Sequence, residues 1–220
     1  MRDIIKTLKR KDVGAIGIGA MIVFIAMVLV AGIAASVLVQ TSTRLESQAM
    51  KTGADTIDEV ATGLAVFDVK GYAATSGNLD KLSICVRARA GSADVDISET
   101  ILELSDTNYK VILNYTQGEY VPDGSGQDNV FGAAFFPGSP SQFGLLVLED
   151  ADNSCALATP VINKGDKVLL GVDLTQAFPD NAGVNARTDI WGSVSPELGS
   201  PGVISFTTPS SYNDNVIDLQ

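Results

Sequence analysis

The sequence contains no histidine, which removes the commonest general base and metal ligand of proteins. It also lacks the G-x-S-x-G motif of serine hydrolases and the glycine-rich lysine loop that holds nucleotide phosphates. Its only two cysteines, Cys85 and Cys155, therefore have no imidazole that could activate them. We expect a protein that is not an enzyme and needs no cofactor; a membrane-anchored enzyme is the least favoured alternative.

Positive charge is scarce outside the first 14 residues. Those residues hold five basic and two acidic side chains, whereas the rest of the chain holds ten basic and 24 acidic ones. Nucleic acids and anionic membranes attract basic surfaces, so we expect this chain to bind no nucleic acid. A basic leader before an apolar segment predicts a cytoplasmic N-terminus and export of the acidic remainder.

Charge is absent altogether from residues 15–39, AIGIGAMIVFIAMVLVAGIAASVLV, and proline is absent from residues 15–67. As a helix the uncharged run would extend about 37 Å, enough to cross a bilayer core of roughly 30 Å. An ordinary signal peptide has a shorter apolar region followed by a cleavage site. Here the run continues into further helical sequence, so we expect it to be retained.

The sequence after residue 39 changes from uniformly apolar to amphipathic. Apolar residues recur at spacings of three, four and seven, from Leu45 through Met50, Ile57 and Val60 to Leu64, with charged residues between them. This period predicts one helix over residues 15–67. A helix whose first half is apolar enough for a membrane and whose second half is amphipathic is expected to pack against other helices. Packing of the second half on the chain's own globular domain is the alternative.

The remainder, residues 68–220, shows short alternating segments separated by glycine, proline and asparagine turns, which are typical of strands. We predict an α+β protein whose long N-terminal helix precedes an antiparallel, immunoglobulin-like β-sandwich. The candidate strands are residues 82–90, 97–104, 109–116, 130–136, 143–148, 168–174, 190–194 and 203–206.

The uncharged helix would be stable in lipid, but outside lipid it must bury its surface against something. Only further copies of the same helix offer enough apolar area, which predicts a helical polymer with the β domains outside. A plain single-span membrane anchor is the alternative. The side chains that we expect to pack in such a helical core are Ile22, Phe24, Met27, Val28, Leu29, Ile33 and Leu38.

Three other kinds of site have a sequence signal. Asn114-Tyr115-Thr116 is an acceptor for N-glycosylation in an exported protein. Cys85 and Cys155 either form a disulfide or remain as two buried free thiols. Two acidic groups offer oxygen ligands that are weak candidates for Ca²⁺, although neither has the spacing of a helix-loop-helix site; solvated loops are the favoured interpretation. These groups contain Asp123 and Asp128, and Asp150 and Asp152.

Both ends of the chain resemble the archaellins, the subunits of the archaeal swimming filament. The likeness lies in GAIGIGAMIVFIAMVLVAGIAASVLVQTS at residues 14–42 and in RTDIWGSVSPELGSPGVISFTTPSSYNDNVIDLQ at residues 187–220. The resemblance implies an extracellular, type IV pilin-like filament subunit that serves motility. A related archaeal pilin that attaches cells to surfaces is the alternative.

The resemblance also implies a class III signal peptide. A prepilin-peptidase-type protease would cut between Gly14 and Ala15 and remove residues 1–14 as a leader. The family usually has a basic pair directly before the glycine, whereas Asp12 and Val13 stand between Lys11 and Gly14 here, so a cut after Lys11 is the alternative. Gly19 stands where bacterial pilins carry a glutamate, which fits an archaellin better.

The partners that the resemblance implies are further copies of the chain, the leader protease, a membrane assembly platform and a motor ATPase. Before assembly the precursor would lie in the cytoplasmic membrane.

Overall fold

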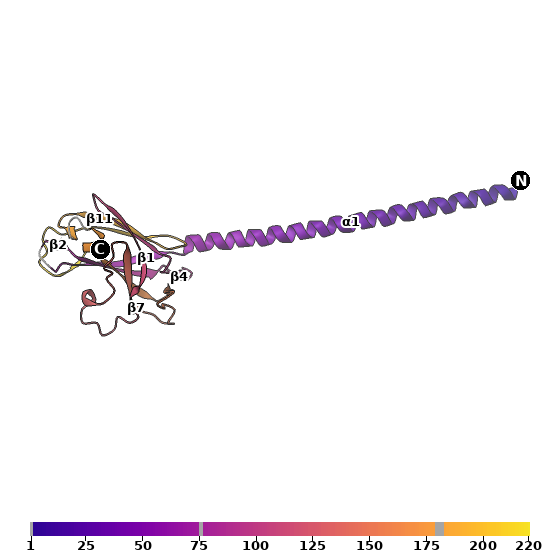
Figure 1. Ribbon diagram of the computed structural model, residues 1–220. Coiled ribbons are helices and arrows are strands. Elements are labelled where there is room, and N and C mark those ends of the chain that lie inside the picture. Colours follow the sequence, from indigo (N-terminus) through magenta and orange to yellow (C-terminus); the bar gives the residue numbers. More distant parts are fainter. Residues whose placement is uncertain (1, 75–76, 179–182) are drawn as a thin grey trace. The chain divides into compact units, whose positions relative to one another are not determined.

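The computed structural model describes residues 2–74, 77–178 and 183–220. They fall into two compact units, divided between Ala54 and Asp55. The first unit consists of helix α1 (Arg2–Ala61; Figure 1) up to Ala54, and the last turns of this helix are counted with the second unit. From Ile16 onward this helix is long and apolar enough to span a membrane. The predicted long helix is therefore present, although it already begins within the leader.

The helix ends at Ala61, six residues before the predicted limit at residue 67. Gly63 lies so close to another segment that a Cβ there would meet the Ser200 carbonyl oxygen at 2.6 Å. Strand β1 (Leu64–Tyr72) starts directly afterwards. Leu64, which the helical period had included, is fully buried in the core of the β domain. The predicted boundary between helix and β domain, at residues 67 and 68, was wrong. The buried apolar residues of β1 directly follow the apolar face of the helix, so the sequence pattern does not separate the two elements.

The β domain contains a nine-stranded sheet in the order β12-β11-β5-β6-β7-β9-β3-β1-β13. Its pairs are antiparallel except for β6 and β7, which run parallel from Asn114 opposite Gln142. The two ends of the sheet approach each other, since Leu64 N donates to Ser200 O at 3.1 Å and Gly202 lies against Val66. One curled, mostly antiparallel sheet thus takes the place of the two separate sheets of an immunoglobulin-like sandwich.

The remaining elements have the following bounds in the structure. The strands of the large sheet besides β1 are β3 (Lys81–Ala88), β5 (Ile101–Ser105), β6 (Lys110–Val121), β7 (Gln142–Glu149), β9 (Lys167–Asp173), β11 (Asp189–Ser195), β12 (Gly202–Thr207) and β13 (Val216–Asp218). Two small ladders pair β2 (Asn78–Leu79) with β10 (Val184–Asn185) and β4 (Val95–Asp96) with β8 (Val161–Ile162). The short helices are η1 (Val130–Gly132) and α2 (Leu174–Ala177).

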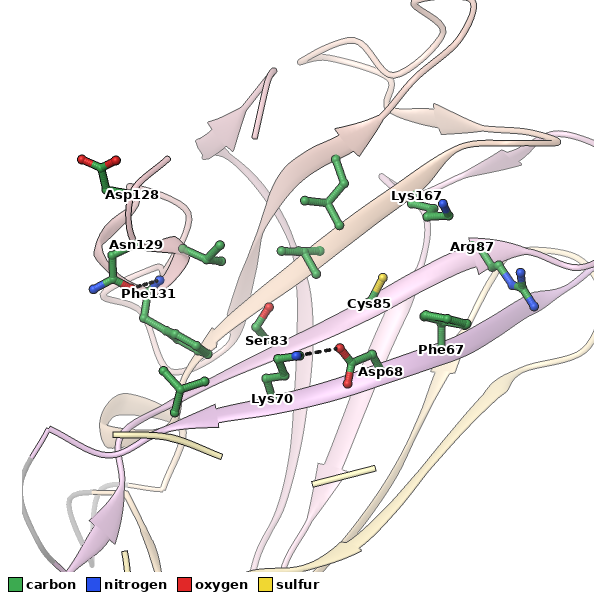
Figure 2. A pocket seen from close by; sticks show the side chains of 14 residues that line it. Phe67, Asp68, Lys70, Ser83, Cys85, Arg87, Asp128, Asn129, Phe131 and Lys167 are labelled. Carbon is green, nitrogen blue, oxygen red and sulfur yellow. Dashed lines mark hydrogen bonds and ion pairs between the residues drawn. The ribbon is translucent and has the colours of Figure 1, made fainter. Parts of the chain in front are cut away.

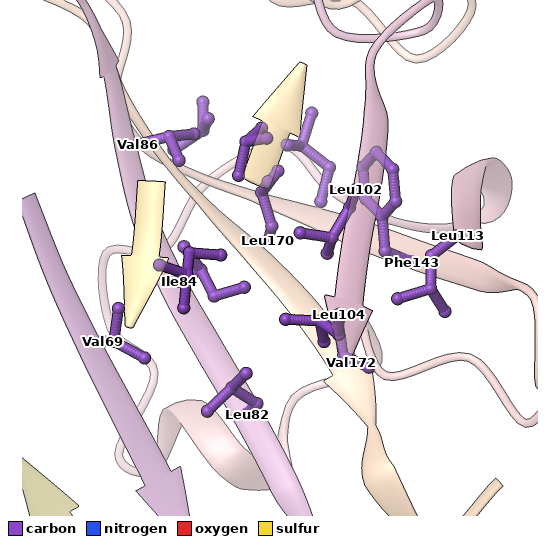
Figure 3. Close-up of a cluster of buried hydrophobic side chains, with 14 of the residues drawn as sticks. Val69, Leu82, Ile84, Val86, Leu102, Leu104, Leu113, Phe143, Leu170 and Val172 are labelled. Carbon is purple, nitrogen blue, oxygen red and sulfur yellow. The ribbon is translucent and has the colours of Figure 1, made fainter. Parts of the chain in front are cut away.

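Alternation along the strands determines which side chains form the core. On β3, Leu82, Ile84 and Val86 point inward and are fully buried, and Ile84 pairs with Leu170 of β9. The same cluster includes Leu102 and other buried side chains of β5, β6 and β7 (Figure 3). The intervening residues of β3 face the other side of the sheet.

The segment 130–136, predicted as a strand, is instead η1 followed by turns. Its aromatic side chains cover the outer face of the sheet: Phe135 is fully buried against Gly144 and Gly171, where a Cβ would meet it at 2.2 and 2.5 Å. Phe131 stacks on Tyr72 with ring centroids 5.2 Å apart. The residues of segment 130–136 are apolar because they cover the outer face of the sheet, and not because they form one of its strands.

Candidate assembly surface

The uncharged part of α1 exposes its apolar side chains on all sides. Each large apolar residue from Ile16 to Val39 is more than half exposed in the single chain. The seven predicted packing residues belong to this set, with exposed fractions of 62% for Ile22, 67% for Phe24, 66% for Met27, 56% for Val28, 58% for Leu29, 58% for Ile33 and 71% for Leu38. Such a surface is unstable in water and needs lipid or protein around it.

Small residues leave room for another helix along this surface. A Cβ added at Gly17, Gly19 or Gly32 would meet no other atom within 4 Å. No contact that the structure describes within the single chain therefore requires glycine at these three positions. Glycine and alanine on a helix surface allow the backbones of two helices to approach closely.

Two hydroxyl groups just after the uncharged run of α1 are satisfied within the helix. Thr41 Oγ1 donates to Leu38 O at 2.9 Å, and Thr43 Oγ1 donates to Val39 O at 3.1 Å. Such back-bonding reduces the cost of burying a hydroxyl in lipid or in a packed bundle. The uncharged surface extends to the first charged residue of this part of the helix, Arg44.

The predicted cleavage point lies within α1. Gly14 is exposed, whereas the side chain of Ala15 lies outside the described part of the chain. The cut between them stays a prediction.

The predicted glycosylation site is accessible. Asn114 is exposed on β6, and its backbone N–H donates to Ser141 O at 3.0 Å. A sugar on the exposed side chain would leave this backbone bond intact.

The two cysteines lie on different sides of the sheet as free thiols. Cys155 belongs to the hydrophobic core, whereas Cys85 faces the outer side of β3, where it lines a groove with Asp68 and Arg87 (Figure 2). The structure therefore favours buried free thiols, and the inward-outward alternation of β3 explains why the pair does not meet. Burial raises the pKa of the Cys155 thiol to about 12 and also raises that of Cys85.

Part of the predicted acidic groups forms a cluster. Carboxylate oxygens of Asp150, Asp152 and Asp166 lie within 4.8 Å of one another. Asp166 follows the turn before β9 and is 1% exposed, and its oxygens accept from Ala151 N at 3.3 Å and Asn163 N at 2.9 Å. Such oxygen donors suit a hard cation such as Ca²⁺. The sequence did not indicate Asp166, because only the fold brings this turn beside residues 150–152.

Hydrogen bonds already hold the other members of the cluster in place. Asp152 accepts from Ser154 N at 3.1 Å and from Asn163 Nδ2 at 2.6 Å, and the bonds from Ser154 and Asn163 lower the pKa of its carboxyl. Asp123 and Asp128 do not belong to this cluster: Asp123 accepts from Ser125 N at 2.7 Å, and Asp128 lines the groove on the outer face.

The fold and the sequence both match known archaeal flagellins. The model of the archaeal-type flagellin family matches residues 14–206. Flagellin B2 of Methanocaldococcus jannaschii is 42% identical over 212 residues, which cover 94% of this chain and 95% of that protein. Flagellin B3 of Thermococcus kodakarensis is 36% identical and covers 96% of this chain and 98% of that protein.

Two solved structures have the same architecture. The crystal structure of archaeal flagellin FlaB1 from M. jannaschii has a TM-score of 0.65 and 35% identity, and covers 73% of this chain and 98% of that one. The archaeal flagellum of Methanospirillum hungatei has a TM-score of 0.61 over 91% of this chain and 98% of that one; at 16% identity it supports the fold alone. The resemblance seen in the sequence is thereby confirmed: this chain belongs to the archaeal-type flagellin family.

Proposed function

We propose that this chain polymerises through α1 into an extracellular filament that cells rotate to swim. The observation that carries the proposal is the uncharged helix surface, on which fifteen large apolar side chains from Ile16 to Val39 are each more than half exposed. Burying the exposed part of one such side chain is worth about 1 to 2 kcal/mol, so the set amounts to roughly 15 to 30 kcal/mol before entropy costs. A bundle of identical helices would supply this burial once the helix leaves the membrane.

The route to the filament follows from the same surface. The precursor would rest in the cytoplasmic membrane with its basic leader inside, because the apolar helix is stable there. Removal of the leader between Gly14 and Ala15 would free the helix end for assembly. A leader protease, a membrane platform and a motor ATPase are the partners that this route requires, and the chain itself would be the passive, non-enzymatic propeller.

Membership in the flagellin family favours the swimming filament over an adhesion pilin. Deleting the encoded chain in its own organism distinguishes the two. We expect loss of swimming and of the filament with surface attachment intact, measured by tracking cells and by electron microscopy. Retained swimming with lost attachment would contradict the proposal.

We also propose that the cluster of Asp150, Asp152 and Asp166 binds Ca²⁺ and so stabilises the loops before β8 and β9. The support is the arrangement of carboxylate oxygens within 4.8 Å of one another, one of them on a buried side chain. Binding to the folded state alone would raise the unfolding temperature in proportion to the logarithm of the Ca²⁺ concentration.

A further inference from the structure

The outer face of β1, β3 and β9 carries a groove formed by two adjoining depressions, each of about 660 Å³. Arg87 and Lys167 line both depressions, which makes them one continuous surface. Figure 2 shows the first depression, where Phe67 and Cys85 lie between the charged side chains. We call this surface the basic groove.

Basic side chains are concentrated at the basic groove. Residues 62–220 contain eight basic and 20 acidic residues, and five of the eight basic ones line this groove. These five are Lys70, Arg87, Arg89, Lys164 and Lys167. Asp68, Asp128 and Asp166 also line the groove, so it carries a net charge of +2, against −12 for residues 62–220 as a whole. The rest of the domain is therefore more strongly acidic than its total charge indicates.

Part of this positive charge is not neutralised. Lys70 pairs with Asp218 at 3.2 Å, and Lys167 pairs with Glu149 at 2.7 Å. Within the described chain, no ion pair involves Arg87 or Lys164, and both side chains are exposed. The guanidinium of Arg87 lies over the ring of Phe67, 5.2 Å from its centroid, and Phe67 is itself 63% exposed. The groove thus combines free positive charge with an exposed aromatic ring.

The C-terminal end of α1 has the complementary chemistry. It carries Asp55, Asp58 and Glu59, and its last turn has no basic residue. Carboxylates at the C-terminus of a helix are unfavourable, because that end of the helix dipole is negative. Ile57 and Val60 on the same stretch are 66% and 75% exposed. This segment would gain from a partner surface that is both basic and apolar.

We propose that the basic groove binds the acidic end of α1, residues 55–60, from a second copy of this chain. Arg87 and Lys164 pair with Asp58 and Glu59 of the neighbouring copy, while Phe67 and the apolar side chains beside it cover Ile57 and Val60. The groove and the helix end are different surfaces, so the contact repeats from copy to copy without closing, as a filament requires. The inference rests on the proposed function, since it needs copies of the chain side by side.

Charge reversal and compensation in the full-length chain test the inference. Like charges facing each other across an interface cost several kcal/mol, so Arg87→Glu combined with Lys164→Glu is expected to reduce the amount of sheared filament about tenfold or more. Adding Asp58→Lys and Glu59→Lys is expected to restore it to within about twofold. Arg87 and Lys164 are both exposed, so these changes leave the core of the domain intact.

The matched control is Lys110→Glu combined with Arg187→Glu, which changes the net charge equally but lies outside the basic groove. It is expected to leave the amount of filament within about twofold of the unchanged chain. Normal filament from the Arg87 and Lys164 variant, or equal losses in the control, would overturn the inference. Both results leave the polymerisation through α1 standing, because that depends on residues 16–39.

Cysteine cross-linking identifies the occupant. Chains with Arg87→Cys and chains with Asp58→Cys, each also carrying Cys85→Ala because Cys85 lines the groove, are co-expressed, and the mixed filaments are oxidised. We expect covalent dimers from the mixture and none from either variant alone, since the remaining native thiol, Cys155, is buried in the core. Monomers only, or dimers from one variant alone, would overturn the pairing of the groove with the helix end.

Discussion

A charge at Val28 should abolish the filament without unfolding the β domain. Val28 lies in the middle of the uncharged stretch of α1 and is 56% exposed in the single chain, so any packing partner must cover it. Val28→Ala removes part of an apolar side chain and should weaken each helix contact by about 1 kcal/mol. Val28→Asp should cost several kcal/mol more for each subunit, because an unpaired carboxylate must then lose its water.

The assay compares both variants with the unchanged chain in filament-forming cells. Electron microscopy and the mass of sheared filament are expected to show nearly normal filaments for Val28→Ala and none for Val28→Asp. One acid at the centre of a membrane-spanning helix costs about 2.5 to 3.5 kcal/mol, which so apolar a segment tolerates. The level of precursor in the membrane fraction therefore separates failed assembly from failed insertion. Normal filaments from Val28→Asp would refute a core of packed α1 helices.

Four further outcomes follow from the sites of the β domain and the leader. Intact mass of the filament protein should exceed that of the polypeptide, and Asn114→Gln should remove the excess. Mass spectrometry of the N-terminal peptide should find Ala15 first; a chain that begins at Asp12 would contradict the predicted cut. Ca²⁺ should raise the unfolding temperature of the unchanged chain, whereas Asp152→Asn should abolish most of this shift, and an equal shift in both would exclude the cluster. Burial raises the pKa of the Cys155 thiol from 9.0 to about 12, so the unfolded state loses this proton at a lower pH than the folded state does. The free energy of unfolding, measured by denaturant titration, should therefore fall between pH 9 and 12. The fall should be smaller in Cys155→Ala.

The parts of the fold that follow a local pattern could be predicted from the sequence. The uncharged stretch of α1 and the strands at residues 82–90, 143–148 and 168–174 correspond to elements of the structure, because their periods directly reflect which side is buried. The end of α1 could not be predicted in this way. Leu64 fits the helical stripe and the buried face of β1 equally well, and the helix stops where Thr62 and Leu64 bond to the distant Ser200.

Features that depend on distant contacts were not evident from the sequence. The parallel pairing of β6 with β7 and the antiparallel pairing of β13 with β1 join segments whose own patterns do not specify a partner. The same holds for the acidic cluster, in which Asp166 joins Asp150 and Asp152 through the fold. Free thiols remained one of two alternatives, because the sequence alone does not place Cys85 and Cys155 on opposite sides of the sheet.

The last residue of the chain is tied to the first strand of the β domain. Val69 N donates to Gln220 O at 3.1 Å, and the side chain of Gln220 accepts from Ser205 N at 2.8 Å. An affinity tag or fluorescent protein fused after Gln220 would therefore disturb its bonds to Val69 of β1 and Ser205 of β12, near which the two ends of the sheet approach each other. The exposed residues 125–127 offer a safer point for a label, because they lie outside the strands and beyond Gly124, whose N–H still donates to Val147 O of β7 at 2.7 Å.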